Sequence, residues 1–158
     1  MDDCQKEFFD CYARTLPYLI DKTSVYIRLR GSLLLNALGA DITLEQFITL
    51  DAISASDNIC QRDLAKILLK DRSNVTRILN ILEKKGLIVR ETSTKGNRVV
   101  KFARMTPKGL KELDKYSKKM KDDLNDFLEQ FNQEELSVMS KMLEQISSKI
   151  SESANIQI

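Results

Sequence analysis

Residues 71–90 read DRSNVTRILNILEKKGLIVR, and their pattern decides the fold. Asp71 stands where a carboxylate can accept hydrogen bonds from the first backbone N–H groups of a helix, and Gly86 suits the left-handed residue that follows a helix end. The apolar residues between them follow the i, i+3, i+4, i+7 spacing of one helix face; they are Val75, Ile78, Leu79 and Leu82. The stretch therefore predicts a helix over about 71–85, with a strand after Gly86.

A second helix is predicted just before this one, from Gln61 to Leu69. Its apolar positions again have helical spacing; they are Leu64, Ala65, Leu68 and Leu69. Only a short turn separates the two helices, so the pair is typical of a helix-turn-helix motif. In such motifs the second helix reads the major groove of DNA, which makes 71–85 a candidate recognition helix.

A β-hairpin is predicted after the recognition helix, within about 87–105. Leu87-Ile88-Val89 is a short apolar run that predicts the first strand, and Thr92 to Asn97 is a polar turn with one glycine. In Val99 to Met105 apolar and polar residues alternate well enough to predict the second strand. A hairpin in this position is a wing. The predicted fold is mainly α with a small β-hairpin wing.

Further helices are predicted around this winged helix-turn-helix domain, which we place at 43–106. An N-terminal helical segment, 1–38, precedes it, and two helices within 107–153 follow it. The expected helices run from near Pro17 to Gly39, from about Thr43 to Ser56, from Thr106-Pro107 to about Phe131, and from about Gln133 to Ser153.

The two C-terminal helices carry apolar seams with steps of three and four residues. The seam of the last helix consists of Leu136, Met139, Leu143, Ile146 and Ile150. Long seams outside a small domain need a partner to cover them, so we expect 1–38 and 107–153 to form the interface of a homodimer. The alternative is that these helices fold back on the first helix within one chain.

The charge is concentrated in one segment. Residues 59–109 hold 13 lysines and arginines against four acidic residues, a net charge of +9, whereas the whole chain has a net charge of +2. A basic segment between acidic ones is typical of a protein that binds a polyanion such as double-stranded DNA. The alternative is a basic surface that is merely solvated.

Several other classes of function are disfavoured by the composition. The chain has no histidine, which excludes Ser-His-Asp and Cys-His catalysis and an HExxH zinc site. It has no glycine-rich phosphate loop and three scattered cysteines, so we expect no enzyme, no metal and no cofactor. We expect no membrane segment or secretory signal, and a cytoplasmic, nucleoid-associated location.

Four stretches together resemble the MarR family of bacterial transcription regulators. They are Leu64-Ala65, Asp71-Arg-Ser-Asn-Val-Thr-Arg77, Leu82-Glu-Lys-Lys-Gly-Leu-Ile-Val-Arg90 and Met105-Thr-Pro-Lys-Gly109. The resemblance covers nearly the whole chain. It implies a triangular dimer, a recognition helix in the major groove and a wing that reaches the minor groove.

The wing departs from the pattern of this family. Members usually carry Asp-x-Arg at positions that hold Asn97 and Val99 here. Arg98 lies between them and can take the minor-groove role if the hairpin is shifted by one residue.

The candidate DNA contacts lie on the recognition helix and the wing. Arg suits guanine and Asn suits adenine through bidentate pairing, so Arg72, Asn74 and Arg77 are the expected base readers. Ser73 and Thr76 are adaptable contacts, although Thr76 and Asn80 can equally face solvent. The full set is Arg72, Ser73, Asn74, Thr76, Arg77, Asn80, Lys95 and Arg98.

The expected function is a DNA-binding transcription regulator, a repressor relieved by a small-molecule or oxidative signal. Cys60 aligns with the capping residue of the first helix of the motif, and a helix N-terminus can activate a thiol. Cys11 lies beside Tyr12 on an early helix, and this neighbourhood resembles that of sensing cysteines in peroxide-responsive relatives. Both are therefore candidate oxidant sensors, whereas inert thiols are the commoner case. The alternative function is a winged-helix protein-interaction module that does not read DNA. A small enzyme built on Asp122, Asp123 and Asp126 is a distant third.

Overall fold

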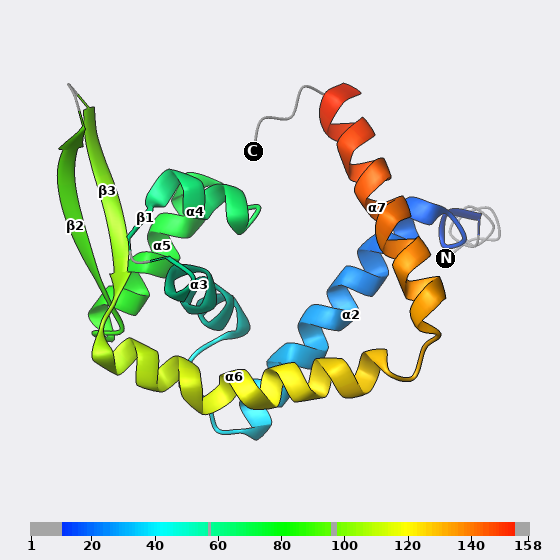
Figure 1. The fold of residues 1–158 in the computed structure, drawn as a ribbon, viewed down its shortest axis with the longest axis horizontal. Helices are drawn as coiled ribbons and strands as arrows, with labels where there is room; N and C mark the ends of the chain where they lie inside the picture. The colour runs from blue at the N-terminus through cyan, green and yellow to red at the C-terminus, as the bar shows by residue number, and fades with distance from the viewer. Residues whose placement is uncertain (1–10, 57, 96–97, 154–158) are drawn as a thin grey trace, which may run out of the picture. The chain divides into compact units, whose positions relative to one another are not determined.

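The computed structural model describes residues 11–56, 58–95 and 98–153, and for residues 94–95 and 98–99 it describes the backbone alone. The chain divides into two compact units, Met1–Leu44 and Glu45–Ile158. Elements carry the labels of Figure 1.

The first unit contains α2 (Leu16–Ala37). Thr15 precedes it, and Pro17 stands in its first turn, where a missing N–H costs no helical hydrogen bond. At the other end Gly39 adopts a φ of +67°, a conformation that favours glycine, and its N–H donates to the carbonyl of Asn36. The predicted start near Pro17 and stop at Gly39 are confirmed.

The second unit holds the helix-turn-helix motif and its sheet. Two helices form the motif, α4 (Gln61–Ile67) and α5 (Arg72–Lys84), and α3 (Leu44–Ser54) precedes them at the unit boundary. The sheet is antiparallel with the order β1-β3-β2, from β1 (Ile59–Cys60), β2 (Ile88–Lys95) and β3 (Arg98–Met105). In Figure 1, β2 and β3 form a two-stranded ribbon beside the helices.

Apolar side chains at helical spacing fill the core of this unit. Leu50 and Ile53 of α3, Leu64 of α4 and Leu79 of α5 are all fully buried. Ile88, the first residue of β2, is buried at the base of the ribbon. The core thus fixes the inner face of α5 against α4 and the sheet, and leaves the opposite face of α5 to solvent.

The wing is longer than the sequence predicts. The predicted polar turn from Thr92 to Asn97 is wrong for Thr92–Lys95, which continue β2 and pair with β3 down to the Lys95–Arg98 rung. Glu91, Thr92 and Ser93 are exposed, so this part of the strand lacks the apolar alternation that marks a half-buried strand. Asn97 lies outside the described residues.

Two further differences lie at the helix-turn-helix motif. The two-residue strand β1 is not predicted; it pairs Ile59 with Ala103 and Cys60 with Phe102. The helix predicted up to Leu69 ends at Ile67, and Leu69 adopts a φ of +50°. The left-handed residue of this turn is therefore an exposed leucine. The sequence has no glycine there from which a left-handed residue could be predicted.

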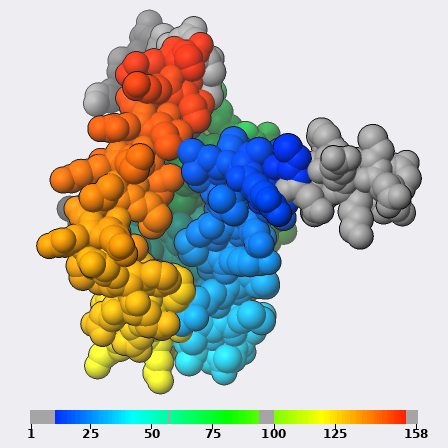
Figure 2. All heavy atoms as spheres, turned by 90° about the vertical axis from the view of Figure 1, so that its right-hand side faces the viewer, coloured from blue at the N-terminus to red at the C-terminus, as the bar shows by residue number. Residues whose placement is uncertain are grey.

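The C-terminal helices are α6 (Pro107–Leu128) and α7 (Gln133–Ser153). Gly109, Leu113 and Tyr116 near the start of α6 are buried. Within Gln133–Ser153, all of which the structure describes, no residue is buried. Figure 2 looks onto α7, drawn in orange to red, where side chains stand out from the surface.

Candidate nucleic-acid interface

The first turn of α5 is fixed by its capping residue. Asp71 accepts a hydrogen bond of 2.9 Å from the Asn74 backbone N–H and one of 2.6 Å from the Asn74 side-chain amide. These two bonds, the backbone one first, hold the pKa of the Asp71 carboxyl below its usual value. The predicted cap is confirmed, and it satisfies a backbone donor of the helix start.

The outer face of α5 is open and cationic. A shallow depression on this face has three cations among its lining residues, and none of the residues that line it in the described chain is acidic. Arg72, Ser73 and Asn80 are exposed on the same face, which the sequence predicts to be the polar side of the helix. The lining residues are Arg72, Ser73, Thr76, Arg77, Asn80, Ile81 and Lys84.

Two of the predicted contact residues are engaged within the motif. The Thr76 hydroxyl donates to the carbonyl of Arg72 at 2.7 Å and accepts from the Gln61 amide at 2.5 Å, so it ties α4 to α5. One N–H of the Asn74 amide is used by Asp71. The amide oxygen and the second N–H of Asn74 are the groups that remain for an adenine edge.

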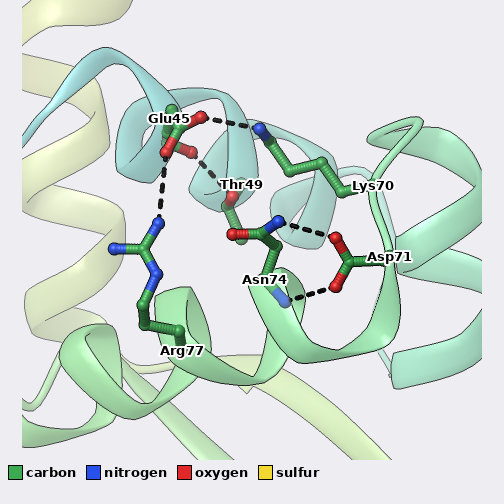
Figure 3. Close-up of polar contacts among 6 residues, drawn as sticks. All are labelled: Glu45, Thr49, Lys70, Asp71, Asn74 and Arg77. Carbon is green, nitrogen blue, oxygen red and sulfur yellow. Dashed lines mark hydrogen bonds and ion pairs between the residues drawn. The ribbon is translucent and has the colours of Figure 1, made fainter.

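Arg77 lies beside a carboxylate from another helix, as Figure 3 shows. Its Nη2 atom is 3.9 Å from Oε2 of Glu45, near the start of α3. The other oxygen, Oε1, accepts a hydrogen bond of 2.6 Å from Nζ of Lys70, in the turn between α4 and α5. One carboxylate therefore connects α3, the turn and α5.

The base of the wing is held by ion pairs, and its far end carries the other predicted contacts. Arg90 of β2 donates from Nε and Nη2 to Oε2 of Glu83 on α5, and this arginine lowers the pKa of the Glu83 carboxyl. Arg104 of β3 pairs with Glu91 of β2 at 2.7 Å. The backbones of Lys95 and Arg98 form the last rung of the ribbon, and their side chains lie outside the described residues.

The start of α6 is bound tightly to the end of α5 and the start of β2. Thr106 caps α6, accepting from the Gly109 N–H at 3.0 Å, and its hydroxyl also lies 2.8 Å from the carbonyl oxygen of Gly86. Lys108 Nζ donates to the carbonyl of Lys85 at 2.6 Å. A Cβ at Gly109 would overlap the Leu87 carbonyl, so this close approach requires glycine.

The two cysteines that the structure describes differ in their surroundings. Cys11 is exposed. Cys60 caps α4: its sulfur accepts from the Asp63 N–H at 3.4 Å, and its S–H donates to Oδ2 of Asp63 at 3.0 Å. This bond to Cys60 is the main cause of a lowered pKa at the Asp63 carboxyl. The predicted capping position of Cys60 is confirmed, and its role as a sensor stays a prediction.

Three residues of this surface are missing from the sequence-based set: Glu45, Lys70 and Gln61. Lys70 and Glu45 are 25 residues apart in the chain, and helical periodicity carries no information about contacts over such a separation. Lys70 does fall in the basic segment, but only the folded chain shows which carboxylate it meets.

Neither a metal cluster nor a membrane span is present in the part of the chain that the structure describes. No group of three or more histidine, cysteine, aspartate or glutamate side chains there can hold a metal ion. None of its helices combines the length and apolar character that crossing a bilayer needs.

Comparison with known proteins finds a family match and a relative by sequence. Residues 40–98 match the model of the MarR family. A protein of Thauera aromatica described as a transcriptional regulator for the hcr operon is 30% identical over 109 residues, which is 68% of this chain. The chain spans 65% of the length of that relative.

Two solved structures share the fold over most of the chain. A DNA complex of MepR from Staphylococcus aureus has a TM-score of 0.75 and 27% identity, over 86% of this chain and 98% of that one. AbsC, a MarR family regulator from Streptomyces coelicolor, has a TM-score of 0.74 and 19% identity, over 95% and 96% of the two chains. The family match spans the helix-turn-helix motif and the first strand of the wing, so residues 40–98 carry the winged-helix segment of the MarR family, and the chain shares the fold of MarR-type winged-helix regulators.

Proposed function

We propose that this protein regulates transcription by binding double-stranded DNA in a sequence-specific manner, as a homodimer on a pseudo-palindromic operator. One observation carries the proposal: α5 is capped and buried on one side, while its open side presents Arg72, Arg77 and Lys84. A helix of this kind fits the major groove, and its first turn supplies the side chains that reach base edges. The MepR relative, whose structure was solved in complex with DNA, supports the same activity here.

The charge of the winged domain supports the same proposal. Residues 59–109 carry a net charge of +9, and the depression on α5 has no acidic side chain in its described lining. Contacts with several phosphates release counterions, so the affinity for DNA falls linearly in a log–log plot against salt.

The homodimer is proposed from the exposed apolar residues of the flanking segments 1–38 and 107–153. Met139 and Ile150 of α7 are 52% and 54% exposed, and Leu16 and Leu33 of α2 are 55% and 59% exposed. A second copy of the chain would cover such surfaces, and residues 43–106 would then form each DNA-binding lobe. Two-fold symmetry predicts inverted half-sites with centres about one helical turn, or ~10 base pairs, apart.

Direct binding measurements test the proposal. The full chain is titrated by fluorescence anisotropy with the promoter beside its own gene and with scrambled duplexes, at several salt concentrations. We expect a preferred site and a steep salt slope. A winged-helix module that only binds proteins would bind neither duplex, and that result would contradict the proposal.

Two substitutions separate base reading from backbone contact. Arg77→Ala is expected to cost ~1–3 kcal/mol on the preferred site and to relax discrimination there. Arg98→Ala is expected to weaken the preferred and scrambled duplexes more equally, because a wing contact falls on the backbone or a narrow minor groove. An unchanged ratio of specific to random affinity in Arg77→Ala would rule out α5 as the reading helix.

The regulation of this activity is also part of the proposal. We expect a repressor in the cytoplasm, at the nucleoid, that a small-molecule or oxidative signal releases from DNA. Cys11 is exposed and Cys60 lies at the start of α4, so mass spectrometry of peroxide-treated protein, combined with Cys11→Ser and Cys60→Ser, tests the oxidative route.

A further inference from the structure

The ion pairs of Glu45 place a fixed anion beside the arginine proposed to read DNA. Lys70 holds Oε1 of Glu45 at 2.6 Å and is itself only 23% exposed, whereas Arg77 lies 3.9 Å from Oε2 and is 62% exposed. One turn further along α3, Thr49 is fully buried and donates to the Glu45 carbonyl at 2.7 Å. Lys70 therefore holds the carboxylate and Thr49 holds the backbone of the same residue, while Arg77 is the most exposed member of the group.

A base edge and a phosphate make different demands on an arginine. Bidentate pairing with guanine needs one orientation of the guanidinium plane, whereas an exposed phosphate accepts it from many directions. An arginine side chain has several rotatable bonds, and holding them in place costs conformational entropy at the moment of binding. A neighbouring anion that restrains the side chain beforehand lowers that cost. Since guanidinium has five N–H donors, a contact at Nη2 leaves others for the base.

We propose that Glu45 is a positioning residue for Arg77, so that a carboxylate outside the helix-turn-helix motif contributes to sequence discrimination. The inference rests on the proposed DNA-binding function. A purely structural role would need only the bond between Glu45 and Lys70, which links α3 to the turn before α5. The approach of Arg77 to the second oxygen is the feature that such a role leaves unexplained.

The substitution Glu45→Gln separates the two roles. Glutamine keeps the length of the side chain and an acceptor for Lys70, but it removes the charge that attracts Arg77. We expect the ratio of specific to random affinity to fall by about two- to tenfold, the range for ordering one side chain at an interface. The affinity for scrambled DNA stays constant or rises, because an anion near the phosphates is gone. The matched control is Asp51→Asn, which removes an exposed carboxylate from the same helix.

The experiment is a double-mutant cycle with the full chain. Unmodified protein, Glu45→Gln, Arg77→Ala and the double variant are titrated with the preferred and the scrambled duplex, after circular dichroism has shown that each is folded. We expect the effect of Glu45→Gln on the affinity ratio to vanish in the Arg77→Ala background. If that effect persists without Arg77, or equals the effect of Asp51→Asn, the inference is wrong.

A measurement without DNA supplies a second test. The 15N relaxation of the Arg77 Nε–H group reports the motion of its side chain in the free protein, and we expect faster, wider motion in Glu45→Gln. Equal motion in both proteins contradicts the inference. If a preferred site exists but Glu45→Gln leaves the ratio of specific to random affinity unchanged, only this inference is overturned. If no preferred site exists, the proposed function is overturned and this inference with it.

Discussion

Two helices of the second unit, α5 and α7, have the same apolar periodicity and opposite environments. The apolar face of α5 consists of Val75, Ile78, Leu79 and Leu82, none of them more than 2% exposed. The corresponding seam of α7 includes Met139 and Ile150, which are more than half exposed. Periodicity therefore reports that a helix has an apolar side, but not whether the same chain covers it. The two faces should respond differently to substitution and to protein concentration.

The largest effect is expected at the seam of α7. Replacing both Leu143 and Ile146 by glutamate places carboxylates in the proposed dimer interface. An uncompensated buried charge costs ~3–5 kcal/mol, so the dissociation constant of the dimer should rise more than a hundredfold. Sedimentation equilibrium measures this change, with Glu144→Gln at an exposed neighbouring position as the control. A folded monomer of the unmodified chain at micromolar concentration would contradict the dimer.

The next largest effect is expected inside α5. Leu79 is fully buried, so Leu79→Ala should lower the free energy of unfolding by ~2–5 kcal/mol through lost apolar contact and the cavity left behind. Urea unfolding monitored by circular dichroism measures it, and Asn80→Ala on the exposed side of the helix is the control. We expect the destabilisation to persist at every protein concentration, whereas that of the α7 variant depends on concentration. A loss below 1 kcal/mol would show that α5 is not packed as described.

A smaller effect is expected where α6 joins the end of α5. Thr106→Ala removes the cap of α6 together with the hydroxyl contacts to Gly86 and Leu87, and should cost ~0.5–2 kcal/mol. Thr106→Ser keeps the hydroxyl and is expected to retain most of the stability. Equal thermal midpoints for the alanine and serine variants would contradict the cap.

The smallest effect is expected from pH at the base of the wing. Arg90 lowers the pKa of Glu83, so the pair stabilises the fold above the ordinary glutamate pKa and is lost as the pH falls through the lower folded value. The pair is partly exposed, which limits its contribution to below about 1 kcal/mol. In urea unfolding at pH 7 and at about pH 3, Glu83→Gln should lose less stability on acidification than the unmodified chain. Equal losses in the two proteins would contradict the prediction.

Local signals predicted the helices well because single residues determine where each helix begins or ends. Asp71, Gly86 and Thr106 each act within a few residues of the chain, and each holds the place that the sequence indicates. The burial of the α5 face followed in the same way from its spacing.

Features that depend on distant or weak contacts could not be predicted. The wing strand from Thr92 to Lys95 is held by backbone pairing with β3, and the exposed polar side chains of Thr92 and Ser93 resemble those of a turn. Leu69 adopts a left-handed conformation because the turn requires it, against the preference of leucine. The approach of Glu45 to Arg77 joins two helices at the surface of the unit, 32 residues apart in the chain, so no local pattern contains it.

Because the wing is long, a small rotation at its base displaces its far end by a large distance. Each strand of the ribbon has eight residues, and at a rise of ~3.3 Å per residue it reaches about 26 Å from its base. A change of about 10° in its direction at Ile88 and Met105 then moves the rung of Lys95 and Arg98 by roughly 4–5 Å, most of the ~6 Å width of a minor groove. The short contacts at the base, between Arg90 and Glu83 and between β1 and β3, therefore fix where the far end lies more firmly than any residue at that end.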